Sequence, residues 1–237
     1  EVLPASAGGT LTGGTSLCAG SSASLSLSGE VGGIQGWESS IDGGANWVPI
    51  AYFNTTYSVS PTQTTDYRVV VQNGTCTEAF STVTTITVDQ PTVAGTVTGG
   101  TTICAGSTSG ILILNSYVGT INKWEYSTDG TNWSDISNTT TTHTSGALTQ
   151  TTHFRAEVQS GVCNPITSGS TTVTVDALTI PGSLAGAATI CSGEATDLTL
   201  TGNNGVVQYW EYSENNGGSW TTISNPSTSY TASPTTT

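Results

Sequence analysis

The chain has 237 residues and a formal net charge of −13, with 3 Lys and Arg residues against 16 Asp and Glu residues. Three basic residues cannot form a patch that neutralises several phosphates, so nucleic acid is excluded as a partner. Its apolar runs are shorter than the ~18 residues that a membrane span needs, which excludes membrane insertion.

Paired tryptophans mark a unit of 86 or 87 residues that occurs three times. This period is longer than the 20 to 50 residues of most solenoid repeats and lies within the size range of independent domains. We therefore predict repeat 1 over residues 1–89, repeat 2 over 90–176 and repeat 3 over 177–237, the last truncated at its C-terminal end. The pairs are Trp37 and Trp47, Trp124 and Trp133, and Trp210 and Trp220.

The residue pattern of each unit predicts β-strands throughout. In repeat 1, Leu25 and Leu27 belong to the second strand, the Trp hairpin follows, and an Asn73-Gly74 turn precedes the closing strand. Repeat 2 has the same plan, with segments at 95–104, 110–115, 122–136, 152–159 and 170–176. About seven strands per unit, with two tryptophans and paired cysteines, predict an all-β chain of immunoglobulin-like antiparallel β-sandwiches.

The strand alternation predicts which side chains face the core. Trp124 and Tyr126 are two residues apart, so we expect them to face inward while Glu125 faces outward. All six tryptophans are predicted to be structural core residues, with Trp124 and its equivalents buried and Trp133 and its equivalents at least partly packed over the hairpin. In the 152–159 segment, Phe154, Ala156 and Val158 are expected to point inward.

The cysteines recur with the repeat. Cys18 and Cys76 are 58 residues apart, and Cys104 and Cys163 are 59 apart. We predict that each pair forms a disulfide within its own repeat, and that Cys191 has a partner beyond the last residue. Disulfides indicate an oxidising, extracellular compartment. The spacing does not fit a zinc site, and no metal or cofactor is predicted.

Short joints separate the units, at 90–92 and at 177–181, and each contains a proline. Such linkers are too short and stiff for free tumbling, so the repeats are expected to form an extended rod.

Several phrases resemble a known class of repeats: C-A-G-S-S-A-S-L-S-L at 18, C-S-G-E-A-T-D-L-T-L at 191, T-T-D-Y-R-V-V-V-Q-N-G-T-C and T-V-T-T-I-T-V-D. They are similar to the tandem immunoglobulin-like repeats of very large Bacteroidetes surface proteins, which include gliding-motility adhesins exported by the type IX secretion system. The resemblance covers all three units. It implies a cell-surface filament in which the repeats act as a stalk.

Other chemical interpretations are weaker. The hairpin turns, such as S-T-D-G-T-N-W, resemble the Asp-box of sialidases, but there the motif is itself a structural turn and the propeller period is shorter. His143 and His153 occur only in repeat 2 and are expected at surface strand positions. No Ser, Asp and His set recurs, so no catalytic residue is predicted.

The joint carboxylates and the single lysine are also assigned no chemical role. Asp89 and Asp176 end equivalent strands but lack the further carboxylates that calcium prefers, so they are predicted to be solvated strand ends. Lys123 is the single lysine, so repeat 1 and the given part of repeat 3 cannot contain a lysine isopeptide bond. Threonine-rich strands are expected to be ordinary exposed strand faces.

Two functions remain open. The first is a non-catalytic repeat segment of an extracellular adhesin or cell-surface filament, which serves as a stalk or fibre. The alternative is an accessory carbohydrate-binding segment of a secreted multi-domain hydrolase. Neighbouring repeats are the expected partners, and surface glycans or other cell-surface proteins are the further partner classes.

Overall fold

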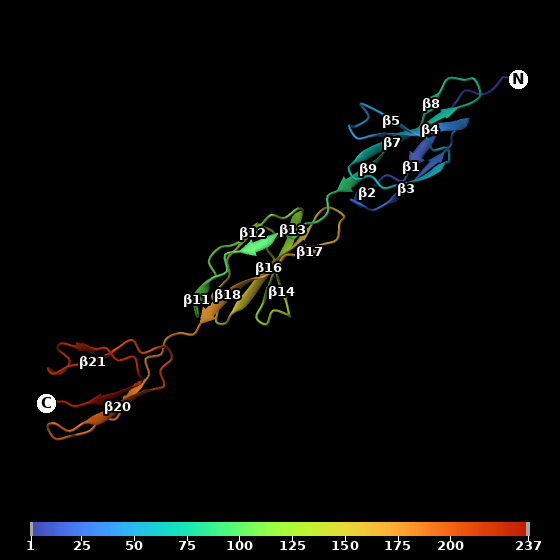
Figure 1. Cartoon of the computed structure of the whole chain (residues 1–237). Coiled ribbons are helices and arrows are strands. Elements are labelled where there is room, and N and C mark those ends of the chain that lie inside the picture. The colour runs from blue at the N-terminus through green and yellow to red at the C-terminus, as the bar shows by residue number, and fades with distance from the viewer. Residues whose placement is uncertain (1, 236–237) are drawn as a thin grey trace. The chain divides into compact units, whose positions relative to one another are not determined.

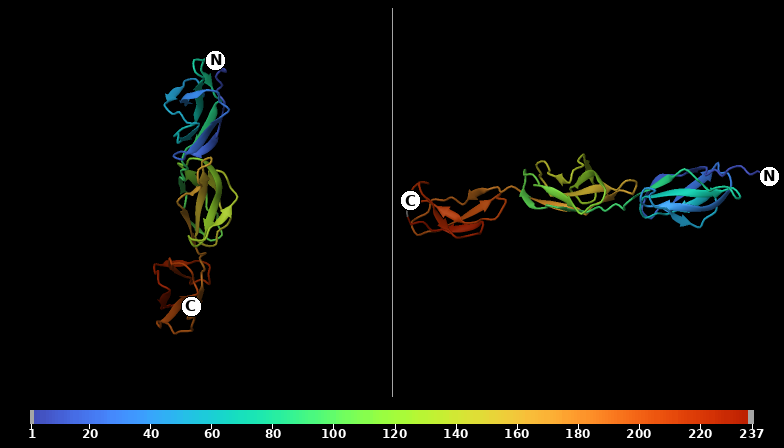
Figure 2. Two further views of the ribbon diagram at one scale, coloured as in Figure 1. Left: turned by 90° about the vertical axis from the view of Figure 1, so that its right-hand side faces the viewer. Right: turned by 90° about the horizontal axis from the view of Figure 1, so that it is seen from above.

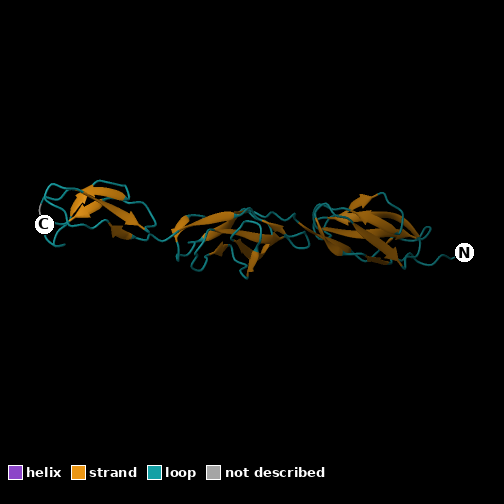
Figure 3. Cartoon of the chain, turned by 90° about the horizontal axis from the view of Figure 1, so that it is seen from below, coloured by secondary structure: helices purple, strands orange, loops and turns teal. Residues whose placement is uncertain are grey.

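The computed structural model describes residues 2–235, and within that range the chain consists of strands, turns and loops without an α-helix (Figures 1 and 3). Contacts divide it into two compact units. Repeat 1 and most of repeat 2 belong to the first. Repeat 3 belongs to the second, together with residues 102–108 and 146–151 and the C-terminal end of repeat 2.

Repeat 1 is a sandwich of two sheets, which appear as two layers at the blue end of the colour scale in Figure 2. One sheet has the order β1-β3-β6, and the other has the order β2-β9-β7-β4-β5 with β8 paired to β7. The strands are β1 (Thr10–Thr12), β2 (Thr15–Cys18), β3 (Ala23–Ser28), β4 (Gly33–Ser40), β5 (Val48–Ile50), β6 (Thr56–Val59), β7 (Thr65–Gln72), β8 (Ala79–Phe80) and β9 (Thr84–Asp89).

Repeat 2 reproduces this topology strand for strand. Its sheets have the orders β10-β12-β15 and β11-β18-β16-β13-β14, with β17 paired to β16. The strands are β10 (Thr96–Thr98), β11 (Thr102–Cys104), β12 (Leu112–Asn115), β13 (Thr120–Ser127), β14 (Ser134–Ile136), β15 (Thr142–His143), β16 (Thr152–Gln159), β17 (Ile166–Thr167) and β18 (Thr171–Asp176).

Five strands of repeat 3 lie within the described residues. Three form the sheet β19-β20-β23, and the Trp hairpin forms the pair β21-β22. The strands are β19 (Ser183–Ala185), β20 (Thr196–Thr201), β21 (Trp210–Tyr212), β22 (Thr221–Ile223) and β23 (Ser229–Ala232).

The first segment of each complete repeat is divided between the two sheets, which the sequence analysis did not anticipate. β1 pairs antiparallel with β3, whereas β2 pairs in parallel with β9, so the sandwich is not purely antiparallel. The crossing point is Gly13, whose φ of 103° suits glycine and where an added Cβ would meet the carbonyl oxygen of Ser24. Gly99 makes the same crossing in repeat 2, between β10 and β11.

The core lies between the two sheets and follows the predicted alternation on most strands. In β16, Phe154, Ala156 and Val158 are buried, as predicted. In β13 the inward position predicted for Tyr126 was wrong, because Tyr126 is 41% exposed. Glu125 lies on the outer face, as predicted, but it is only 6% exposed because Lys123 and Arg155 cover it.

The first tryptophan of each repeat is a core residue. Trp37 and Trp124 are fully buried, and Trp210 is 8% exposed. Each indole N–H donates a hydrogen bond to a backbone carbonyl oxygen 16 or 17 residues later in the chain, so its polar atom has a partner. Of the second tryptophans, Trp47 and Trp133 are half-buried beside an arginine. Trp220 is 60% exposed, so its placement among the core residues was wrong.

Candidate functional site

A disulfide joins repeat 1 to repeat 2. Cys18 is the last residue of β2 and pairs in register with Asp89, the last residue of β9. Cys163 follows β16, 145 residues later, and its sulfur is bonded to that of Cys18. The bridge therefore links the end at which the chain leaves repeat 1 to a turn of repeat 2. We call this turn, residues 160–164, the joint turn.

The predicted pairs Cys18–Cys76 and Cys104–Cys163 do not form, because Cys76, Cys104 and Cys191 are free. β2 runs parallel to β9, so Cys18 lies at the exit end of repeat 1. β7 runs antiparallel to β9, so the turn after β7 that holds Cys76 lies at the opposite end. Equal spacing in every repeat cannot distinguish a bridge within a repeat from a bridge to the next one.

Hydrogen bonds reinforce the joint around the bridge. The Thr92 hydroxyl accepts a hydrogen bond from the backbone N–H of Ser160, at 3.1 Å, and donates one to the carbonyl oxygen of Asn164, at 2.9 Å. The carboxylate of Asp89 accepts from the backbone N–H of Val162, at 2.9 Å. Asp89 was predicted to be a solvated strand end, and that prediction was wrong because its charge is used to hold repeat 2.

A glycine permits this close approach. Gly161 has φ of 47°, and an added Cβ would overlap the carboxylate of Asp89. The sulfur of Cys163 lies 3.3 Å from the carbonyl oxygen of Gln90, and Cys163 is only 2% exposed. The joint turn thus contacts the linker at Gln90 and Thr92, which removes much of the freedom that a three-residue linker would otherwise have.

The Trp hairpins are braced by their own polar side chains. In repeat 1 the hydroxyl of Ser40 donates to Asp42, whose carboxylate accepts from both the backbone and the side-chain N–H groups of Asn46. These hydrogen bonds, with those to Asn46 largest, lower the pKa of Asp42 to about 2. Asp129 accepts equivalent bonds in repeat 2, which also lower its pKa. The carboxylates are therefore turn acceptors and not candidate acids.

Arginine covers the second tryptophan in each complete repeat. The guanidinium of Arg155 lies 3.9 Å from the ring centroid of Trp133, and its Nε lies 2.6 Å from the carboxylate of Glu125. Arg68 makes the same two contacts in repeat 1, at 4.1 Å from Trp47 and 2.6 Å from Glu38. Lys123 adds a second cation to Glu125 and also contacts Asp135, which with Glu125 raises the lysine pKa.

The two histidines have structural positions. His143 was predicted at a surface position, but it is half-buried and its ring packs between those of Trp124 and Phe154. Burial lowers its pKa. His153 lies on β16, with its Nδ1 2.9 Å from the hydroxyl of Thr172.

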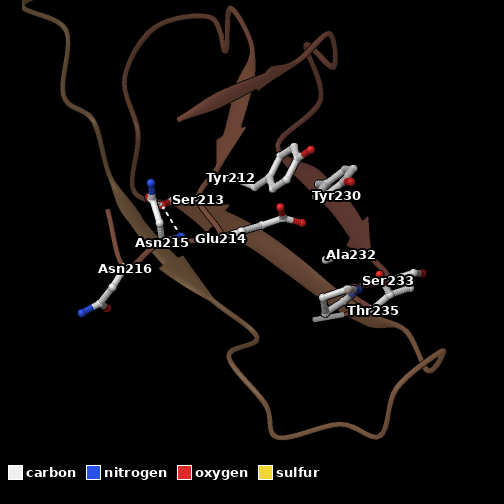
Figure 4. Close-up of a pocket in the computed structure, with 10 residues that line it drawn as sticks. Tyr212, Ser213, Glu214, Asn215, Asn216, Tyr230, Ala232, Ser233 and Thr235 are labelled. Atoms are coloured by element: carbon white, nitrogen blue, oxygen red, sulfur yellow. Dashed lines mark hydrogen bonds between the residues drawn. The ribbon is translucent and has the colours of Figure 1, made fainter. Parts of the chain in front are cut away.

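A pocket of about 790 Å³ lies in repeat 3, and Glu214 is the one carboxylate among its lining residues (Figure 4). Tyr212 and Tyr230 lie on one side of it (Figure 4). Their counterparts in repeat 2 are Tyr126 and His143, and Phe154 of β16 pairs with the first and packs on the second. The pocket is therefore the space that a strand equivalent to β16 fills in a complete repeat.

Residues 2–235 lack two further kinds of feature. No group of three or more His, Cys, Asp or Glu side chains there could hold a metal ion. The same residues contain no helix long and apolar enough to cross a membrane.

A family model matches the chain three times, at residues 7–90, 93–177 and 180–237. The chain belongs to DUF8696, a domain family of unknown function. No curated protein matches it. The three DUF8696 repeats are also similar to a solved structure of a marsupial T cell receptor, with 13% identity, a TM-score of 0.51, and coverage of 89% of this chain and 90% of that one. That likeness supports an immunoglobulin-like fold.

A second solved structure, of the FN1–FN3 domains of chicken CNTN1, matches with 11% identity and a TM-score of 0.36, covering 98% of this chain and 89% of that one.

The joint between repeats 1 and 2 is the feature that sequence reasoning missed most completely. Asp89 and Thr92 belong to no recognisable sequence motif. The feature that indicates the joint is the position of Cys18 and Asp89 at the ends of parallel neighbouring strands, and this position is known only once the fold is known.

Proposed function

We propose that this chain is a non-catalytic segment of an extracellular adhesin or cell-surface filament, in which DUF8696 repeats form an extended stalk that carries tension. The disulfide between Cys18 and Cys163 is the observation that carries the proposal. Neighbouring repeats are the partners in this role. A Bacteroidetes surface protein exported by the type IX system is the setting that the resemblance of the repeats favours.

The bridge provides a direct path for force. Tension applied at the two ends passes along the backbone to Cys18, across the sulfur–sulfur bond, and on from Cys163. The residues between them form a closed loop that tension cannot extend, even when their sandwiches unfold. A joint of this kind limits lengthening to the segments outside the loop, which is a useful property in a stalk.

The surface chemistry fits this role better than glycan binding. A disulfide is typical of proteins in an oxidising compartment. Exposed aromatic rings are the usual platforms for sugars, but Arg155 and Arg68 cover the rings of Trp133 and Trp47. An accessory carbohydrate-binding segment therefore has fewer free aromatic faces in the two complete repeats than their composition suggests.

Single-molecule force spectroscopy tests the proposal. The loop closed by the bridge spans 145 residues, or about 500 Å of extended chain. Pulled by its ends, the oxidised chain should never release this length, and adding a reductant should release it. A Cys18→Ser, Cys163→Ser double variant should give the released length without reductant. Full extension of the oxidised wild-type chain would contradict a tension-bearing joint.

A further inference from the structure

The free cysteines Cys104 and Cys191 are followed by the same turn as the bridged Cys18. Cys18 is followed by a turn in which its carbonyl oxygen accepts from the backbone N–H of Ser21, at 3.0 Å. Cys104 accepts from Ser107 at 3.1 Å, and Cys191 accepts from Glu194 at 3.0 Å. We call these three the exit cysteines.

The strand positions also agree for the first two exit cysteines. Cys18 pairs in parallel with Asp89, and the next residue donates its N–H to the carbonyl oxygen of Asp89 at 3.0 Å. Cys104 pairs in parallel with Asp176, and its next residue donates to Asp176 at 2.9 Å. Cys104 therefore lies at the exit end of repeat 2 as Cys18 lies at that of repeat 1, and it is exposed.

Cys76 occupies in repeat 1 the position that Cys163 occupies in repeat 2. Its backbone N–H donates to Asn73 at 3.0 Å, as that of Cys163 donates to Ser160 at 2.8 Å. Residues 73–77 are thus the joint turn of repeat 1. This turn also holds the segment that leads into its repeat, because the backbone N–H of Asn73 donates to the Ser6 hydroxyl at 2.9 Å. The sulfur of Cys76 lies 3.6 Å from the carbonyl oxygen of Pro4, beside that segment.

We propose that Cys76, Cys104 and Cys191 are each half of a joint of the Cys18–Cys163 type, and that the partner of each is another DUF8696 repeat. An exit cysteine takes the joint-turn cysteine of the repeat that follows it, and Cys76 takes the exit cysteine of a repeat that precedes it. The bonded pair in this same chain is the independent observation that supports this assignment.

The bond forms by thiol–disulfide exchange with a small-molecule disulfide such as oxidised glutathione. One cysteine thiolate attacks the donor disulfide, which gives a mixed disulfide and releases one glutathione thiolate. The second cysteine thiolate attacks the protein sulfur of that mixed disulfide and releases the second glutathione thiolate. The two protein thiols lose two electrons and two protons in total, and the donor disulfide is reduced to two thiols.

Successive joints of this type would interlock. Cys104 lies inside the loop closed by Cys18 and Cys163, so a bond from Cys104 to the next repeat begins within one loop and ends beyond it. Every residue between the first and last bridges would then lie inside at least one closed loop.

The test completes repeat 3 by appending a copy of residues 152–176 after Thr237, which supplies a joint-turn cysteine and a phenylalanine for the pocket beside Tyr212 and Tyr230. The extended chain is refolded with reduced and oxidised glutathione, its free thiols are blocked, and it is digested with trypsin without reduction. The copied segment carries its own arginine, so its cysteine leaves on a separate peptide. We expect that peptide to be joined to 69–123, through Cys104.

Matched variants identify the partner. Cys76→Ser should leave the new link intact, and Cys104→Ser should abolish it. A link from the copied cysteine to Cys191, or a free copied cysteine in a folded extended chain, would overturn the proposal.

The original chain offers a second test that does not depend on the extension. In a Cys18→Ser variant, the proposal predicts that Cys163 stays free and all four remaining thiols are blocked. A bond between Cys104 and Cys163 in that variant would show that these positions prefer pairing within a repeat, and would overturn the proposal.

Discussion

Cys18 and Cys163 are 145 residues apart in the sequence, yet their Cα atoms lie 4.8 Å apart and their sulfurs are bonded. The first belongs to the strand that ends beside the exit of repeat 1, and the second to the turn that receives the linker in repeat 2. In the chain-entropy treatment, a loop of this length stabilises the folded state by up to about 5 kcal/mol. The joint is thus fixed covalently as well as by the hydrogen bonds of Asp89 and Thr92.

Replacing Trp124 should destabilise repeat 2 much more than replacing Trp133. Trp124 is fully buried, so Trp124→Ala leaves a large cavity and should cost roughly 3 to 5 kcal/mol. Trp133→Ala mainly loses its contact with Arg155, worth about 1 kcal/mol. Hydrogen exchange of β13 and β16 amides measures repeat 2 separately from its neighbours. Equal losses of protection in the two variants would contradict the observed core.

Arg155 should stabilise repeat 2 through its contacts with both Glu125 and Trp133. Arg155→Ala leaves a carboxylate with a 7% exposed side chain and one remaining cation, Lys123. We expect a loss of roughly 1 to 3 kcal/mol in the free energy of unfolding of repeat 2. Arg155→Lys keeps the charge but loses the planar stacking, so its loss should be intermediate. An unchanged denaturant midpoint in the alanine variant would show that the stack is only a surface contact.

His143 should make repeat 2 less stable in mild acid. Burial lowers its pKa from the ordinary 6.5, so the unfolded chain binds the proton more readily. The free energy of unfolding therefore falls as pH drops below about 6.5, and stops falling below the lowered pKa. His143→Tyr installs the residue found at this position in the other repeats, Tyr57 and Tyr230, and should remove this dependence. A His153→Gln control should keep it, and identical pH profiles for wild type and His143→Tyr would refute the assignment.

Asp42 should make the stability of repeat 1 depend on pH in a more acidic range. Hydrogen bonds lower its pKa from 3.8 to about 2, so its contribution is present above pH 3.8 and is lost as pH falls through this window. Asp42→Asn should remove that dependence while keeping the turn, because Asn215 already accepts equivalent bonds in repeat 3. Thermal unfolding from pH 5 to pH 2 measures the effect, which would be refuted by parallel curves for the two proteins.

The repeat period, strand alternation and Trp hairpin were sufficient to predict the sandwich, because these signals are local. Trp124 and the inward side chains of β16 follow directly from the two-residue period of a strand. The exposure of Tyr126 and the burial of Glu125 depend on tertiary contacts, among them those of Glu125 with Lys123 and Arg155, which no local pattern encodes.

The disulfide-bonded joint between repeats 1 and 2 could not be predicted, because it also depends on contacts that are distant in the sequence. The cysteine spacing is the same whether the bridge closes within a repeat or between repeats. The choice is decided by the parallel pairing of β2 with β9, which places Cys18 at the exit end. That pairing depends on the sheet crossing at Gly13, and the sequence offers only a Gly-Gly pair as a sign of it.

Unreduced peptide mapping tests the central claim most directly, because the chain has only three trypsin sites, at Arg68, Lys123 and Arg155. Free thiols are blocked before denaturation, and the digest is analysed by mass spectrometry. The inter-repeat joint predicts that fragment 1–68 is linked to fragment 156–237, while fragment 69–123 is unlinked and carries two blocked thiols. Fragment 69–123 linked to either of the other two would contradict it.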